Sequence, residues 1–167
     1  IAKKNKMILQ VGHLERFNPM VVALKQKVTN AFRINAVRHS IFKERGTEVD
    51  VVLDSMIHDI DFILDFEQSK LVNIEASGVS LKSDAIDRAQ VTLSFESGLE
   101  AHLEADRVAD SAKREICIET TEYNYSIDFL THEASIEQKS DRIIQRDELI
   151  EKIPDTSFSV NQLPEKI

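Results

Sequence analysis

Residues 50–61 place a carboxylate and an imidazole, those of Asp54 and His58, four positions apart. On an α-helix, side chains with this spacing share a face. A carboxylate beside an imidazole on a rigid element is a standard way to hold a proton-transfer group near neutral pH. The spacing therefore makes Asp54 and His58 candidate catalytic residues.

The same stretch also fits the solvent-exposed face of an amphipathic helix. Its polar residues recur at i, i+4, i+7 and i+11, as Asp54, His58, Asp61 and Asp65. The opposite face is apolar and carries Leu53, Met56, Ile57, Ile60, Ile63 and Leu64. Such a pattern is typical of any helix that packs on a core. Spacing alone thus leaves a catalytic and a purely structural interpretation open.

The composition bounds the class of protein. A chain of 167 residues with 42% apolar residues is expected to form one folded domain. Its net charge of −8 argues against nucleic-acid binding, which needs clustered Lys and Arg. No apolar run is long enough to span a membrane, so no membrane contact is expected. Cys117 is the only cysteine, which predicts a reduced thiol and a cytoplasmic setting.

Several site chemistries find no support in the sequence. The four glycines, which could form a phosphate-binding loop only if clustered, are at least 20 residues apart: Gly12, Gly46, Gly78 and Gly98. The five histidines and Cys117 show no close pairing of the kind that binds zinc. A divalent ion at Asp54, His58 and Asp61 would have too few converging ligands. We therefore expect no metal.

The hydrophobic patterning predicts an α+β fold with an open, mostly antiparallel sheet of six or more strands and helices on one face. Asn18 and Pro19 form a helix start, and this helix should run to about Val28. Asp50 can cap a second helix that ends near Phe66. Strands are expected at residues 7–12, 33–42, 71–81, 88–96, 99–105, 114–120, 125–130, 133–138 and 142–146.

Four motifs occur in a fixed order along the chain. They are Gly12-His13-Leu14-Glu15-Arg16-Phe17-Asn18-Pro19, Asp54-Ser-Met-Ile-His58-Asp59-Ile60-Asp61, Phe95-Glu-Ser-Gly98 and Ala105-Asp-Arg107-Val108. Together, over roughly residues 5 to 130, they resemble the C-terminal half of the glucose–fructose oxidoreductase, inositol dehydrogenase and rhizopine-catabolism (Gfo/Idh/MocA) family. Members pair an N-terminal Rossmann domain that binds NAD or NADP with a C-terminal domain like that of glyceraldehyde-3-phosphate dehydrogenase.

The resemblance implies roles for four residues. His58 would act as the general base on a sugar hydroxyl, and Asp54 would bind or polarise the substrate. Arg16 and Asn18 would lie where they can contact the substrate or the cofactor. For these two residues a structural alternative stays open: Asn18 caps its helix, and Arg16 pairs with Glu15 or with an acidic helix.

The resemblance also implies a division of the chain. Residues 1–12 are expected to be the end of a Rossmann domain, 13–153 the substrate-binding and oligomerisation domain, and 154–167 a C-terminal extension or loop. The family's Gly-rich loop and Glu-Lys-Pro lysine are not in this sequence. We therefore expect a piece of a longer enzyme, inactive alone.

The parent would transfer hydride between NAD or NADP and a hydroxyl of a sugar, cyclitol or nucleotide-sugar, with a UDP-N-acetylglucosamine-like substrate as one candidate. The family's open sheet further implies a homodimer or tetramer. The alternative is a non-catalytic dimerisation or ligand-binding module of the same fold.

Overall fold

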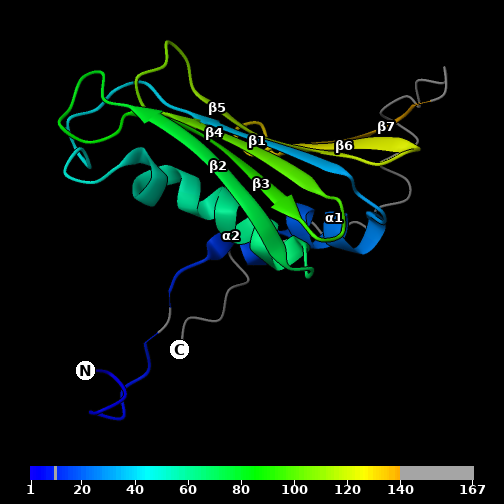
Figure 1. The fold of residues 1–167 in the computed structure, drawn as a ribbon, viewed down its shortest axis with the longest axis horizontal. Helices are drawn as coiled ribbons and strands as arrows, with labels where there is room; N and C mark the ends of the chain where they lie inside the picture. Colours follow the sequence, from blue (N-terminus) through cyan, green and yellow to red (C-terminus); the bar gives the residue numbers. More distant parts are fainter. Residues whose placement is uncertain (10, 140–167) are drawn as a thin grey trace.

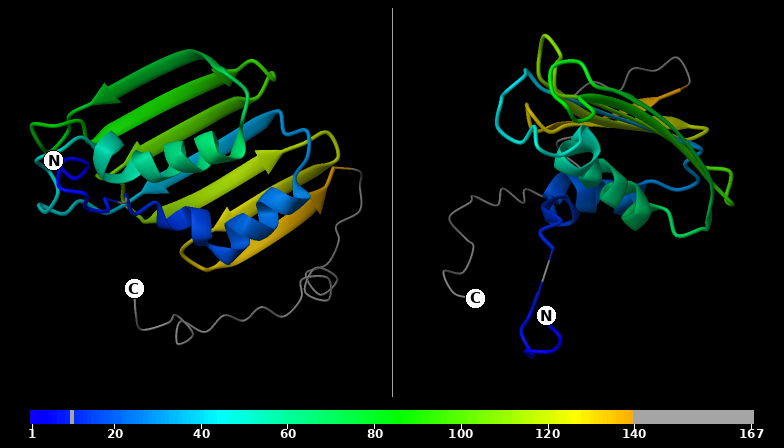
Figure 2. Two further views of the ribbon diagram at one scale, coloured as in Figure 1. Left: turned by 90° about the horizontal axis from the view of Figure 1, so that it is seen from below. Right: turned by 60° about the vertical axis from the view of Figure 1, so that its left-hand side comes forward.

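The computed structural model describes residues 1–9 and 11–139. It has two layers: a curved sheet, and helices that cover one face of it (Figures 1 and 2). The helical elements are η1 (Leu14–Phe17), α1 (Pro19–Lys27), η2 (Val52–Met56) and α2 (Ile57–Phe66). The strands are β1 (Arg33–His39), β2 (Leu71–Val79), β3 (Arg88–Phe95), β4 (Glu100–Asp106), β5 (Lys113–Glu119), β6 (Tyr123–Asp128) and β7 (Glu133–Gln138).

The seven strands lie in the order β2-β3-β4-β1-β5-β6-β7. β1 is central and runs parallel to β4, whereas every other pair of neighbours is antiparallel. The expected α+β fold with an open, mostly antiparallel sheet and helices on one side is thereby confirmed. β1 precedes α2 in the chain, so the sheet is not confined to the second half of the sequence.

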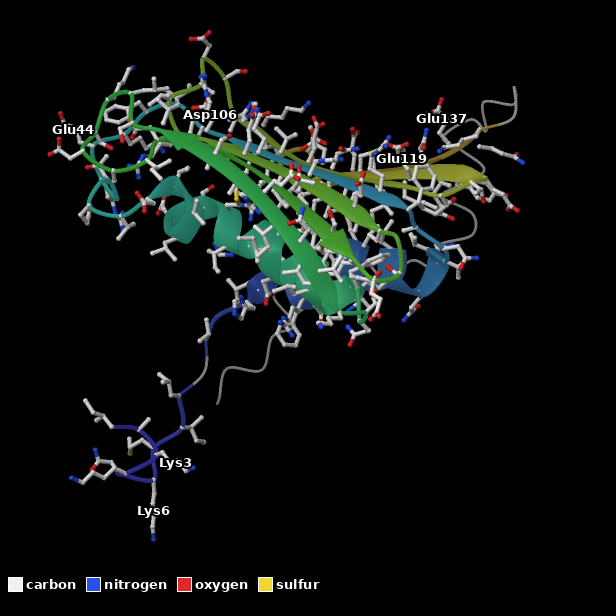
Figure 3. All side chains as sticks on the ribbon, viewed as in Figure 1. Lys3, Lys6, Glu44, Asp106, Glu119 and Glu137 are labelled. Carbon is white, nitrogen blue, oxygen red and sulfur yellow. The ribbon has the colours of Figure 1, made fainter. Side chains whose placement is uncertain are left out.

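Alternation of buried and more exposed residues along the inner strands separates two faces of the sheet. Ile34 and Ala36 of β1, and Ile116 and Ile118 of β5, are buried beneath the helices, on what we call the helix face. The residues between them point to the other side, the open face, where Figure 3 shows Glu119 above the sheet. Burial of one row and exposure of the other fixes the register of each strand, because a one-residue slip would exchange the two rows.

Helix α1 starts as the sequence predicts. The Asn18 side chain accepts a hydrogen bond from the Met20 amide at 3.1 Å, and Pro19 occupies the first helical position. The second helix starts differently. Asp50 Oδ1 accepts from the Ile86 amide at 2.8 Å, so it ties the helix to the chain before β3 and does not cap it. The prediction that Asp50 caps this helix was therefore wrong.

The strand expected at residues 7–12 is not formed by the described residues of that range. Met7, Ile8, Leu9 and Val11 are exposed, and the segment projects away from the two layers (Figure 1). A strand needs a hydrogen-bonded neighbour, and no sheet edge lies beside this segment. The strand expected at 142–146 and the extension at 154–167 lie outside the described residues. Across the described part of the chain, no helix combines the length and apolar character that crossing a membrane requires.

Candidate functional site

His58 lies in the first turn of α2, on the helix face of the sheet, and is half-buried. Burial lowers the pKa of its imidazole below the ordinary value. The guanidinium groups of Arg38 and Arg114 lower it further, whereas the carboxylates of Asp59 and Glu15 act in the opposite direction. His58 is therefore held toward its neutral form, which is the form that can accept a proton.

The two arginines beside His58 occupy directly opposite positions on β1 and β5. Arg38 binds Asp59 through two hydrogen bonds, Nε to Oδ2 at 2.9 Å and Nη2 to Oδ1 at 2.6 Å, and both side chains are at least nine-tenths buried. Arg114 donates to Glu15 of η1 and lies with its guanidinium carbon 5.4 Å from the centre of the Phe129 ring. Each arginine thus has a carboxylate of its own.

The segment that carries η1 binds α2 through a second group of ion pairs. Arg16 donates from Nε to Asp61 Oδ2 at 2.9 Å, and its Nη1 lies 3.3 Å from Asp65 Oδ1. His13 Nδ1 lies 3.3 Å from Asp61 Oδ1. The hydrogen bonds from Arg16 lower the pKa of Asp61, against the effect of its burial. Lys25 of α1 completes the group by binding Asp65. Two motifs that are far apart in the sequence therefore meet here.

The polar stripe of residues 54–65 was also consistent with the solvent-exposed face of a helix, but part of this stripe is buried. Asp61 is only 7% exposed, because Arg16 covers it. Conversely, Leu53 and Leu64, expected on the buried side, are 63% and 48% exposed. Asp54 does lie at the surface. The helix therefore presents both an ion-paired face and an exposed apolar one, which a plain amphipathic helix on a domain surface does not do.

Asp54 lies one turn before His58, in the five-residue π-helical turn η2. The Ile57 amide donates to the Val52 carbonyl, an i to i−5 bond, so this turn is wider than an α-helical one. Side chains at i and i+4 are then not stacked, and among the described residues no hydrogen bond joins Asp54 to His58. The Asp54 carboxylate instead lies against the Gly46 turn, where an added Cβ would be 3.4 Å from Asp54 Oδ1.

Arg16 and Asn18 both have structural partners. Arg16 forms the ion pairs with α2, and Asn18 caps α1, as the structural alternative for each residue anticipated. A contact of either residue with substrate or cofactor stays a prediction.

The fully buried carboxylate of Asp87 fixes the β2–β3 loop and, through Arg107, the loop that leads into η2. Asp87 Oδ2 accepts from the amides of Leu81, Lys82 and Ser83 at 2.7, 2.6 and 2.9 Å. Its Oδ1 accepts from Ser83 Oγ at 2.6 Å and from Arg107 Nε at 2.8 Å. Arg107 also donates to the carbonyl oxygens at positions 46 and 49. Arg107, part of a motif read from the sequence, thus acts structurally and anchors the chain next to Asp54.

Sequence reasoning missed Arg38 and Arg114, although a signal for both was present. Arg38 continues the alternation of Ile34 and Ala36, and Arg114 lies two residues before Ile116. Each is a charged residue at a position where the pattern calls for an apolar one. A buried charge must be paired, so such a position marks a place where the structure supplies a partner.

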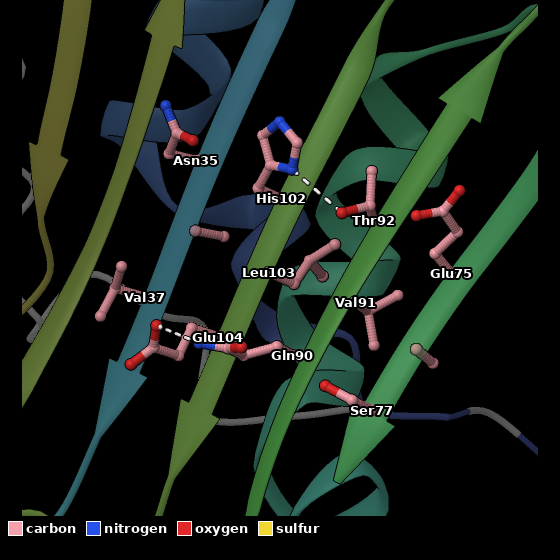
Figure 4. Close-up of a pocket in the computed structure, with 12 residues that line it drawn as sticks. Asn35, Val37, Glu75, Ser77, Gln90, Val91, Thr92, His102, Leu103 and Glu104 are labelled. Atoms are coloured by element: carbon pink, nitrogen blue, oxygen red, sulfur yellow. Dashed lines mark hydrogen bonds between the residues drawn. The ribbon is translucent and has the colours of Figure 1, made fainter.

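The open face holds a shallow depression of about 560 Å³ over β1 to β4 (Figure 4). Thr92 Oγ1 and His102 Nδ1 are 3.1 Å apart across it, and Gln90 donates to Glu104. Cys117 also belongs to this face and is a free thiol whose pKa is raised by burial and by neighbouring carboxylates. The described residues contain no cluster suited to a metal ion.

Comparisons with known proteins point to one family. The sequence profile described as the GFO/IDH/MocA C-terminal domain matches residues 26–126. A UDP-N-acetylglucosamine 3-dehydrogenase from Acidithiobacillus ferrooxidans is 32% identical over 133 residues, which are 79% of this chain and 42% of that protein.

Solved structures agree with this assignment of the fold. A structure of UDP-N-acetylglucosamine 3-dehydrogenase GnnA from Acidithiobacillus ferrooxidans superposes with a TM-score of 0.76 at 29% identity, over 87% of this chain and 47% of that one. A levoglucosan dehydrogenase in complex with NADH and L-sorbose superposes with a TM-score of 0.69 at 13% identity. The match covers 81% of this chain and 44% of that one. The chain thus spans less than half the length of each of these proteins.

Proposed function

Because the chain belongs to the GFO/IDH/MocA C-terminal domain family, we propose that it is the substrate-binding and oligomerisation domain of an NAD- or NADP-dependent oxidoreductase. The parent enzyme would transfer hydride between the nicotinamide and a carbon that bears a hydroxyl group. The relatives named for a nucleotide-sugar and for levoglucosan support a carbohydrate as substrate. The 32% identity to a UDP-N-acetylglucosamine 3-dehydrogenase favours a nucleotide-sugar among carbohydrates.

The observation that carries the proposal is the environment of His58. When hydride leaves a carbon, the hydroxyl proton on that carbon must be accepted by a base within hydrogen-bond reach. A half-buried imidazole with a lowered pKa is neutral at physiological pH and can accept this proton. Asp54, exposed at the same end of the helix, would bind the substrate hydroxyls. In this proposal Arg16 and Asn18 act mainly by holding the segment around η1 in place.

The proposed cofactor domain would precede η1. Exposed apolar side chains run from residue 7 into η1, and include Ile8, Leu9, Val11, Leu14 and Phe17. Leu53 adds to this apolar surface at the start of the second helix. Exposed apolar side chains that gather in one segment are typical of a surface that packs against a partner, which supports contact with a second domain. The sequence contains no phosphate-binding glycine loop, so the nicotinamide cofactor, which would take up the hydride, would be held mainly by that domain. A cytoplasmic location would suit an enzyme with this cofactor and a free thiol.

The test of the catalytic proposal uses the full-length gene product. His58→Asn should abolish turnover while NAD(P) binding, followed by fluorescence titration, stays unchanged. His132→Asn is the matched control, because His132 is exposed in a turn with φ 57°, a conformation that Asn adopts readily. Unchanged turnover in the His58 variant would remove the catalytic role and leave the alternative of a non-catalytic binding module.

We also propose that the open face joins two copies of the chain. The face spans seven strands, and none of the described elements covers it (Figure 2). Val37 lies near its centre, directly opposite Glu104 on one side and Glu115 on the other. Val37→Glu would add a third carboxylate to this group and should convert the assembly to monomers in sedimentation. Val22→Glu, on the exposed side of α1, is the control and should leave the assembly intact.

A further inference from the structure

Three carboxylates around His58 are engaged by other cations, whereas that of Asp54, one turn earlier, lies against the Gly46 turn. Asp59, its neighbour on α2, binds Arg38 of β1, and Glu15 of η1 binds Arg114 of β5. Asp61, one turn further along the helix, binds Arg16 of η1. Among the described residues, no hydrogen bond or ion pair joins any of these carboxylates to the imidazole. The acidic groups that α2 and η1 bring close to His58 are therefore already paired.

This arrangement is the reverse of a carboxylate–histidine pair. A free carboxylate next to an imidazole stabilises the protonated ring. A carboxylate bound by a guanidinium loses most of that effect, and the guanidinium itself repels a second positive charge. Arg38 and Arg114 lie side by side beneath the helix because their strands pair directly at these two positions. The sheet thus holds two guanidinium groups side by side, each bound to a carboxylate, and both act against a positive charge on His58.

We propose that Arg38 and Arg114 are positioning residues of the proposed reaction, which engage Asp59 and Glu15 and so keep the imidazole of His58 in its neutral, proton-accepting form. The inference rests on the proposed function, because only a base benefits from this arrangement. Arg114 is the better residue to substitute in a test. One-third of its side chain is exposed, whereas the Arg38–Asp59 pair is so deeply buried that removing one partner threatens the fold.

The primary experiment is an NMR titration of His58 in this chain, with the signal assigned by its loss in His58→Asn. Arg114→Gln removes a positive charge near the ring and should shift the titration of His58 to higher pH. Glu15→Gln removes a negative charge and should shift it to lower pH. Arg114→Lys keeps the positive charge, and His58 in this variant should titrate as it does in the parent. Opposite signs for the two Gln variants cannot arise from a general loosening of the structure.

The matched control is Lys113→Gln. Lys113 precedes Arg114 on the same strand but points to the open face, where it pairs with Glu115. The substitution removes the same charge from the neighbouring residue and should leave the titration of His58 unchanged. A titration that does not move in Arg114→Gln, or that moves equally in the control, would overturn the inference.

A kinetic measurement on the full-length protein separates this inference from the proposed function. In Arg114→Gln the acidic limb of the kcat/KM profile should move to higher pH, because the base is then protonated over a wider range. Turnover that persists in His58→Asn would refute the proposed function and leave the titration results standing. If the acidic limb of the kcat/KM profile does not move in Arg114→Gln, while turnover is lost in His58→Asn, only the role of Arg114 is refuted.

Discussion

Replacing Asp87 by Asn should destabilise the chain by about 3–5 kcal/mol, the usual cost of leaving one member of a buried ion pair uncompensated. Asp87 is fully buried and Arg107 is only 6% exposed. The two carboxylate oxygens accept five hydrogen bonds, from three amides, one hydroxyl and the guanidinium. An Asn side chain fits the space, but its NH₂ group would face donors on one side. A loss of this size is a large part of the stability of a typical domain, about 5–15 kcal/mol.

The measurement is urea unfolding of parent and variant at pH 7, followed by circular dichroism. Asp84→Asn is the control, because Asp84 lies in the same loop and is exposed. Its substitution should change the free energy of unfolding by less than about 0.5 kcal/mol. A loss below about 1 kcal/mol for the Asp87 variant would refute the assignment of this carboxylate as the anchor of the loop.

The pH dependence gives a second check on Asp87. Burial acts to raise the pKa of this carboxyl, but hydrogen bonds from Ser83, Lys82 and Arg107 outweigh it and hold the pKa well below the ordinary value. The unfolded chain therefore takes up a proton near pH 4 that the folded chain does not. The ionised Asp87 carboxyl therefore stabilises the folded chain fully above that pH, and this stabilisation is lost as the pH falls below it. The difference in the free energy of unfolding between the parent and the Asp87→Asn variant should become smaller in acid. A difference that stays constant down to pH 3 would contradict this reasoning.

Three further substitutions, and a glycine control for one of them, test other parts of the structure by the same unfolding assay. Asn18→Ala should cost about 1 kcal/mol, because it removes the cap of α1, and a neutral result would contradict the capping role. Gly98→Ala should cost about 1 kcal/mol, because φ is +89° in this turn, whereas Gly12→Ala, with open space around it, should not be destabilising. Arg16→Gln should lower the free energy of unfolding only slightly, because this side chain is 41% exposed, and should raise the pKa of Asp61 in an NMR titration.

The strands of the sheet were predictable because local patterning determines them, whereas the strand expected at 7–12 does not form in the described residues. The range 88–96 alternates apolar and polar residues, and the structure forms β3 over Arg88–Phe95, while the range expected at 133–138 coincides with β7. Strand order was not predictable in the same way. β1 lies between β4 and β5, and pairing across such a distance in the sequence leaves no local signal.

The sequence singles out Asp54 and His58 as candidate site residues, but it does not reveal their contacts. The α-helical rule aligned Asp54 with His58, whereas the π-helical turn separates them. The row that included Asp61 looked solvated, because nothing in the helix itself indicates that Arg16 will cover it. Ion pairs between distant segments decide burial here, and a pattern within one element cannot reveal them.

The central place of β1 also constrains the order in which the protein can be assembled. β1 leaves the ribosome early, but its neighbours are residues 100–106 and 113–119. Until residues 100–106 have been synthesised, β1 lacks both of its neighbours, and its other side stays unpaired until β5 follows. Nascent chains that end before β5 should therefore remain open to proteases and chaperones, and the sheet should close in one late, cooperative step.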